Sequence, residues 1–106
     1  MSKITKLFRD SGIGYRYYGV SYTDMAIELI KQDESRLYNL QHGVYEKIAE
    51  KVGCQPESVE SDIRTVVKHL WKRDSQRLKE LAGFELETEP SVLRFLEILF
   101  NYDQRS

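Results

Sequence analysis

Cationic side chains recur at helical spacing between residues 56 and 73 of this 106-residue chain. At 100° per residue, Arg64, Lys68 and Lys72 fall on one side of a helix. The same side carries an acidic residue and three small hydroxyl residues: Glu57, Ser58, Ser61 and Thr65. Lysine and arginine contact DNA phosphates, and small polar residues near the start of a helix can approach base edges or the backbone. The pattern therefore has the residue types that a DNA recognition helix needs.

Carboxylates at the start of the same stretch weigh against DNA contact. Glu57, Glu60 and Asp62 occupy the first two turns, where no cation precedes Arg64. A carboxylate can accept a hydrogen bond from a cytosine amino group, but the surrounding phosphates repel it. Acidic residues also stabilise the positive end of any helix, which explains Glu57 and Asp62 without DNA. From the residues alone, a DNA-binding ridge and a merely solvated helix face both stay open.

Other reactive residues give weaker indications. Cys54 with His42 or His69 could form a nucleophile and its base, but no third group that would orient the base is identifiable. We interpret Cys54 as a small buried hydrophobic residue. Glu46 and Glu50 lie one turn apart like paired acids, but they alternate with lysines as a solvated face does. Because zinc-finger spacing and a Walker-type loop are lacking, we expect neither an enzyme nor a metal or other cofactor.

Two helices joined by a tight turn would position the cationic ridge. Apolar residues recur every four positions and predict a helix over residues 44–52. Gly53 would end it, because glycine adopts the left-handed conformation without steric penalty. Pro56 suits the first turn of a second helix over residues 56–73, the predicted recognition helix. Such a pair is typical of a helix-turn-helix, whose second helix normally enters the DNA major groove.

The remaining apolar patterns predict further helices and no strand. Ser21 and Asp24 are a near match to a capping box, so one of these helices should start at Ser21. Pro90 should begin the last one. We place the further helices over residues 2–11, 21–32, 34–41, 75–82 and 90–102. The fold class is all-α, with about six helices around a helix-turn-helix, in a single domain spanning residues 1–106.

Two segments have alternative interpretations. The last helix is apolar over most of its circumference, so it is either central to the core or shared with a second subunit, and we favour the core. The segment 12–20 interleaves Tyr15, Tyr17 and Tyr18 with Arg16, a combination that could stack on bases of a single strand. We favour tyrosines that cover the core, because tyrosine usually buries its ring and keeps its hydroxyl in water.

Composition restricts the classes of protein further. Sixteen basic and seventeen acidic residues give a net charge of −1, so any DNA contact must come from local charge. The apolar runs are too short to cross a bilayer, and the N-terminal residues have no signal-peptide pattern. Cys54 is the only cysteine, which fits a reducing compartment. We therefore expect a cytoplasmic protein that does not bind membranes.

Four strings of the sequence resemble a known family in order and spacing. They are ITKLFRDSGI, GVSYTDMAIELI, VYEKIAEKVGCQPESVESDIRTVVKHLWKRDS and LAGFELETEPS. The family is the C-terminal effector domain of the stage-zero sporulation protein A regulators of endospore-forming bacteria, and the resemblance covers about residues 4–100. Its most specific part is the combination of Ile48-Ala49, Val59-Glu60, Ile63-Arg64, Trp71 and Arg73.

The resemblance implies a compact all-helical DNA-binding domain of a transcription regulator, with copies pairing in tandem on adjacent sites. Glu60 and Arg64 match positions of the family's recognition helix that face DNA. Ser58 and Ser61 stand where the family carries arginines, and a serine cannot offer guanine the bidentate fork of an arginine. The family's full regulator also has a receiver domain before the effector, which is not part of the sequence here. The sequence is then either an excised domain or a stand-alone relative controlled in another way.

Two functional hypotheses follow. The first is a sequence-specific double-stranded DNA-binding transcription regulator related to sporulation initiation, with Arg64, Lys68, Lys72 and Arg73 on phosphates and Ser58, Glu60, Ser61, Thr65 and Arg64 toward bases or backbone. The second is a protein-interaction domain that kept the fold and lost DNA affinity, pairing with a relative or with an RNA polymerase subunit. Its reasons are the net charge, the two serines and the apolar last helix.

Overall fold

The computed structural model describes residues 2–14 and 17–105, and all regular structure in those ranges is helical. It contains five α-helices, one short 3₁₀ segment and one π-helical turn: α1 (Lys3–Asp10), α2 (Tyr18–Gln32), η1 (Glu34–Tyr38), η2 (Gln41–Tyr45), α3 (Glu46–Val52), α4 (Pro56–Ala82) and α5 (Val92–Gln104). The all-α class is confirmed. The expected number of about six helices is slightly off.

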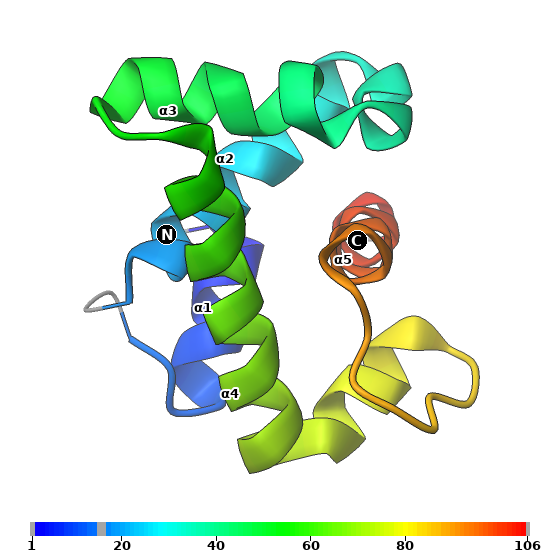
Figure 1. The fold of residues 1–106 in the computed structure, drawn as a ribbon. Helices are drawn as coiled ribbons and strands as arrows, with labels where there is room; N and C mark the ends of the chain where they lie inside the picture. The colour runs from blue at the N-terminus through cyan, green and yellow to red at the C-terminus, as the bar shows by residue number, and fades with distance from the viewer. Residues whose placement is uncertain (1, 15–16, 106) are drawn as a thin grey trace.

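The predicted helix-turn-helix is present as α3 and α4. The turn η2 leads directly into α3, which ends at Gly53 with φ of 80°, the left-handed conformation expected of a glycine there. Gln55 then precedes α4, which has Pro56 in its first turn. In Figure 1, α3 runs along the top of the molecule and α4 descends from it, with α2 behind α4 and α5 to one side.

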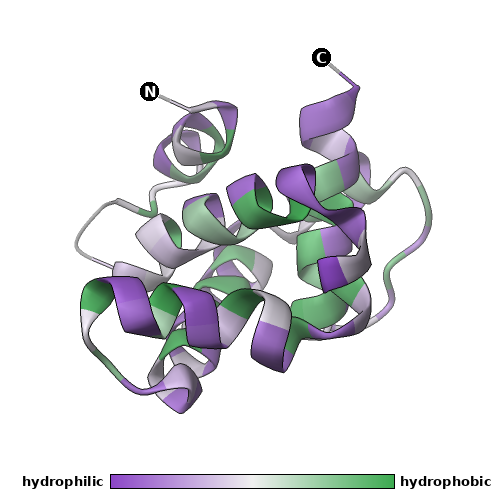
Figure 2. Ribbon diagram, turned by 90° about the horizontal axis from the view of Figure 1, so that it is seen from above, coloured by the Kyte–Doolittle hydropathy of each residue, from purple (hydrophilic) through white to green (hydrophobic). Residues whose placement is uncertain are grey.

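The core lies between α2, α4 and α5. The inward side of α4 is fully buried from its first turns onward, at Val59, Ile63, Val66, Val67 and Leu70. Phe8 of α1 and Phe95 of α5 face each other with ring centroids 6.1 Å apart. Figure 2 shows the resulting separation, with hydrophobic segments turned inward and hydrophilic ones outward on most helices. The face of the recognition helix that we expected to point inward is therefore the face that packs into the core.

The last helix belongs to the core of the chain itself. Phe95, Leu96 and Leu99 have no exposed surface, although Leu93 at the start of α5 is 47% exposed. The expectation that favoured the core over a second subunit agrees with this burial. The helix begins at Val92, later than the expected Pro90, because the Ser91 hydroxyl caps it by accepting a hydrogen bond from the Arg94 N–H (3.1 Å).

Two other helix boundaries differ from expectation. The helix α2 starts at Tyr18, so Ser21 lies within its first turns and is not its cap. The earlier start lets Gly19 and Val20 pack into the core, and this packing outweighs the capping signal. The expected helix over residues 34–41 is a 3₁₀ segment that ends at Tyr38, and the chain re-enters helix at η2.

A kink divides α4 after the predicted recognition helix. Asp74 has φ of −152° and ψ of 56°, which is not helical. Its carboxylate accepts a hydrogen bond from the Arg77 N–H (3.3 Å), as an N-cap does for a new helix. The other carboxylate oxygen accepts one from the Ser11 hydroxyl (3.3 Å). The stretch from Ser75 onward is therefore a separate helical segment, as the sequence predicts, and it turns away at the bottom of Figure 1.

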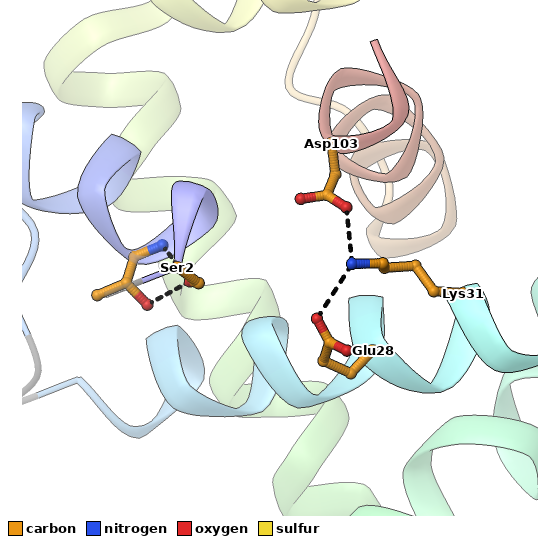
Figure 3. A network of polar contacts seen from close by, with 5 residues as sticks. Ser2, Glu28, Lys31 and Asp103 are labelled. Carbon is orange, nitrogen blue, oxygen red and sulfur yellow. Dashed lines mark hydrogen bonds and ion pairs between the residues drawn. The ribbon is translucent and has the colours of Figure 1, made fainter. Parts of the chain in front are cut away.

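Polar contacts at the ends of the helices hold the bundle together (Figure 3). Ser2 caps α1 by accepting a hydrogen bond from the Thr5 N–H (3.0 Å). Lys31 of α2 pairs with Asp103 of α5 (3.2 Å) and with Glu28 of its own helix (3.4 Å), and these carboxylates raise its pKa. Lys31 therefore links α2 to α5, the two helices that flank the inward side of α4, through an ion pair at the surface.

Two helices approach each other closely at Gly19. A Cβ atom added at Gly19 would overlap the backbone carbonyl of Asp62 and the side chain of Val66, both on α4. The backbone of α2 therefore rests directly on α4, and only glycine permits this contact. The same region holds the buried Thr23 hydroxyl, which donates to the Gly19 carbonyl (2.6 Å).

We predict that Gly19→Ala lowers the free energy of unfolding by about 1–3 kcal/mol, because the added methyl group forces α2 and α4 apart. Urea denaturation followed by circular dichroism measures this. Gly14→Ala is the matched control, since no atom lies within 4 Å of a Cβ there, and it should change stability little. An equal loss in both variants would contradict the role of the close contact.

Candidate nucleic-acid interface

The side of α4 that faces solvent matches the predicted ridge. Its members are all exposed: Glu57, Ser58, Ser61, Arg64, Thr65, Lys68 and Lys72. We call these residues the α4 ridge. Lys68 and Lys72 reach into solvent and are not covered by the body of the protein. The first part of α4 therefore presents three cations and three hydroxyl side chains along one exposed line.

One hydroxyl side chain of the ridge makes a hydrogen bond within the helix. The Thr65 hydroxyl donates a hydrogen bond to the Ser61 carbonyl (3.0 Å), one turn earlier. Ser58 and Ser61 lie in the first two turns, at the end where recognition helices meet base edges. Their short side chains leave space for a groove to come close to the helix backbone.

One cation of the ridge is engaged by a carboxylate. Arg64 forms an ion pair with Glu60, which lies four residues earlier at the edge of the ridge. Both side chains stay substantially exposed, at 56% for Arg64 and 35% for Glu60, so the pair contributes little to stability. Its effect is local, because it partly neutralises the positive charge nearest the start of α4.

A buried tyrosine supports that edge of α4. Tyr45, at the end of η2, is only 6% exposed. Burial raises the pKa of Tyr45 to about 12, with the Glu60 carboxylate adding to the rise and the Arg64 guanidinium opposing it. The phenol ring therefore lies close to the Glu60–Arg64 pair and connects the recognition helix to the segment before α3.

The opposite edge of α4 is fixed by the segment that precedes α2. The Arg73 guanidinium donates a hydrogen bond to the Gly12 carbonyl (3.0 Å), and the ring of Tyr17 packs on His69 with centroids 5.0 Å apart. Arg73 is thus tied to the flank of the helix, beside the ridge and not on it. It remains exposed, so a phosphate contact by Arg73 stays a prediction.

Sequence reasoning did not find the cluster on this flank. Tyr22 of α2 lies next to Cys54 in the turn and to Asp62 of α4, and its pKa is raised by burial and by these neighbours. Cys54 is half-buried against the core, whereas we expected it to be a small buried hydrophobic residue. Tyr15 and Arg16 lie outside the described residues. The tyrosine spacing alone gave no signal for which ring would be buried.

The described residues offer little for other chemistry. His42 is exposed and pairs with Glu46 (2.9 Å), which lowers the pKa of that carboxyl. Across residues 2–14 and 17–105, no three His, Cys, Asp or Glu side chains gather where they could hold a metal ion. Within the same ranges, no helix has the length and apolar character needed to cross a bilayer.

A helix-turn-helix with an exposed cationic ridge on its second helix is the arrangement that helix-turn-helix DNA-binding domains share. The family described as sporulation initiation factor Spo0A C terminal matches residues 4–102 of the chain. The chain therefore belongs to this family of helical DNA-binding domains, which is a family of transcription factors and not of enzymes. No solved structure shows significant similarity to the chain.

Tyr45 gives a prediction for alkaline pH. Below pH 10 its phenol is neutral in both the folded and the unfolded chain. Between pH 10 and about 12 only the unfolded chain ionises it, so the free energy of unfolding falls as pH rises. We expect Tyr45→Phe to lose this part of the pH dependence, as measured by urea denaturation from pH 9 to pH 12.

The fully solvated Tyr38, which is 92% exposed, provides the control. Tyr38→Phe should leave the alkaline slope of the wild-type protein unchanged. If Tyr45→Phe also kept that slope, the raised pKa of Tyr45 in the folded chain would be wrong.

Proposed function

We propose that this domain binds double-stranded DNA sequence-specifically and regulates transcription related to sporulation initiation, with the first part of α4, residues 56–73, as the recognition helix. The observation that carries the proposal is the exposed α4 ridge on the second helix of a helix-turn-helix. Lys68 and Lys72 are solvent-facing and lie in line with Arg64. Membership in a family of DNA-binding domains supports the same function.

The attraction of DNA phosphates depends on the local charge of the α4 ridge and not on the net charge of the chain. The chain has a net charge of −1, and Glu57, Glu60 and Asp62 lie on or beside the first two turns of the ridge. The positive charge of the ridge is therefore concentrated in its later turns, at Lys68 and Lys72. Phosphate contacts depend on charges within about a Debye length, which is about 8 Å at physiological ionic strength, so a ridge of this kind can bind while the whole chain is acidic. Lys68, Lys72 and Arg73 would contact phosphates.

Base recognition would involve the start of α4. Ser58, Ser61 and Thr65 can donate to or accept from base edges, and Glu60 can accept from a cytosine amino group. With serines in place of the arginines that the resemblance implies at these positions, the domain would prefer a different DNA sequence from its relatives. Pairing of two copies on adjacent sites is part of the same proposal.

A protein-interaction domain is the second candidate. The apolar last helix does not support this candidate, because α5 is buried in the core of the chain itself. Two exposed apolar side chains still favour it: Phe84, in the link between α4 and α5, and Leu93, in the first turn of α5, are each 47% exposed. A partner such as an RNA polymerase subunit would contact this surface, and such binding is compatible with a DNA-binding ridge elsewhere.

We predict that Lys68→Ala weakens binding to all duplexes alike and lowers the slope of log affinity against log salt by about one, because one phosphate contact is lost. Fluorescence anisotropy with a pool of random duplexes at several salt concentrations measures both quantities. Lys6→Ala is the control, since Lys6 is exposed on α1, which packs against α2 and α5. If wild-type protein showed no binding at low salt, the proposed function would be wrong.

Glu60→Gln should have the opposite effect on non-specific binding. The change removes a charge that phosphates repel and releases Arg64 from its ion pair. We expect tighter binding to random duplexes, with a stability change below about 0.5 kcal/mol, because exposed ion pairs contribute little. Anisotropy together with urea denaturation tests this. Weaker binding to every duplex would mean that the Glu60–Arg64 pair holds Arg64 in its binding position.

A further inference from the structure

Tyr18 is a large aromatic residue that the fold does not bury. It stands at the first position of α2 and is 71% exposed, whereas the expectation was that the tyrosines of this segment cover the core. Among the described residues, none accepts a hydrogen bond from its hydroxyl. Tyr17, the neighbouring residue, follows the expectation, since it is half-buried against the core.

The ring of Tyr18 is nevertheless held in place. It stacks on Tyr22, one turn later on α2, with centroids 6.3 Å apart and ring planes 18° apart. Tyr22 is in turn partly buried against the core and lies near Cys54 and Asp62. A stacked ring loses little conformational entropy when it contacts a ligand, because its side chain has few rotatable bonds and one favoured position.

The stacked pair lies beside the helix-turn-helix. Cys54 belongs to the turn between α3 and α4, and Asp62 belongs to the second turn of α4. The contact of Gly19 with the Asp62 carbonyl places the first turn of α2 against the same part of α4. Tyr18 therefore lies on the flank of the recognition helix, near the end that carries Ser58 and Ser61.

We propose that Tyr18 is a second point of DNA contact, in which its hydroxyl donates a hydrogen bond to a phosphate oxygen of the strand beside the α4 ridge. This inference rests on the proposed DNA-binding function. A duplex keeps its bases paired and stacked, so an aromatic ring outside the groove meets the backbone and not a base face. Tyrosine hydroxyls are among the groups that make such phosphate contacts, which position a protein on the duplex without reading its sequence.

Tyr18 differs from the cations of the ridge in one measurable respect. A neutral hydroxyl displaces no condensed counterion, so losing it should weaken binding without changing the salt dependence. Loss of the Lys68 side chain should change both the affinity and its salt dependence. The combination of lower affinity and an unchanged salt slope therefore identifies a neutral phosphate contact.

The test compares Tyr18→Phe with wild-type protein by anisotropy on random duplexes at several salt concentrations. We expect about a tenfold weaker affinity, since a hydrogen bond to a charged group is lost, together with an unchanged salt slope and an unchanged melting temperature. Tyr38→Phe is the matched control, because Tyr38 is 92% exposed on η1, which packs against α2, η2 and α5. It should bind as wild type does.

Three results would overturn the inference. Affinity of Tyr18→Phe within twofold of wild type would show that the hydroxyl makes no contact. An equal loss in Tyr38→Phe would show that the effect is not local. A lowered salt slope in Tyr18→Phe would show that a charged contact had been disturbed instead. In each of these cases wild-type protein still binds DNA, whereas failure of the proposed function itself appears as wild-type protein that binds no duplex.

Discussion

The contact of the α2 backbone with α4 at Gly19 determines how the rest of the domain is arranged. Because no side chain separates the two helices there, α4 is held with its apolar side against α2 and α5 and its polar side toward solvent. The flank contacts of Tyr17 with His69 and of Arg73 with Gly12 follow from the same approach. An exposed ridge of fixed orientation is thus a consequence of packing and not only of the ridge residues.

If the ridge binds DNA as proposed, its charges are a compromise between two demands. Acidic residues near the start of α4 favour the helix through its dipole, while DNA favours cations. The structure separates these demands along the helix, with carboxylates in the first two turns and Lys68 and Lys72 further on. The ion pair of Glu60 with Arg64 lies at the boundary between the two regions. Non-specific affinity would therefore come from the later turns, while the earlier turns influence which sequence is preferred.

Much of this arrangement could be predicted from the sequence, because it depends on local signals. The period of apolar residues identified the buried side of α4, and Gly53 and Pro56 identified the turn. The resemblance to the sporulation regulators was confirmed over residues 4–102. The start of α2 was predicted wrongly, since the burial of Gly19 depends on its contact with Asp62 and Val66, which are distant in the sequence. The exposure of Tyr18 and the support of the ridge by Tyr45 depend on tertiary packing in the same way, so no spacing rule could reveal them.

The most direct test of DNA binding by the α4 ridge is selection of bound duplexes from a random double-stranded pool by the purified domain. We expect one sequence class to be enriched over successive rounds, and its affinity to fall linearly on a log–log plot as salt rises. A pool that remains random after selection, with no salt-dependent binding, would contradict the claim that the α4 ridge binds DNA.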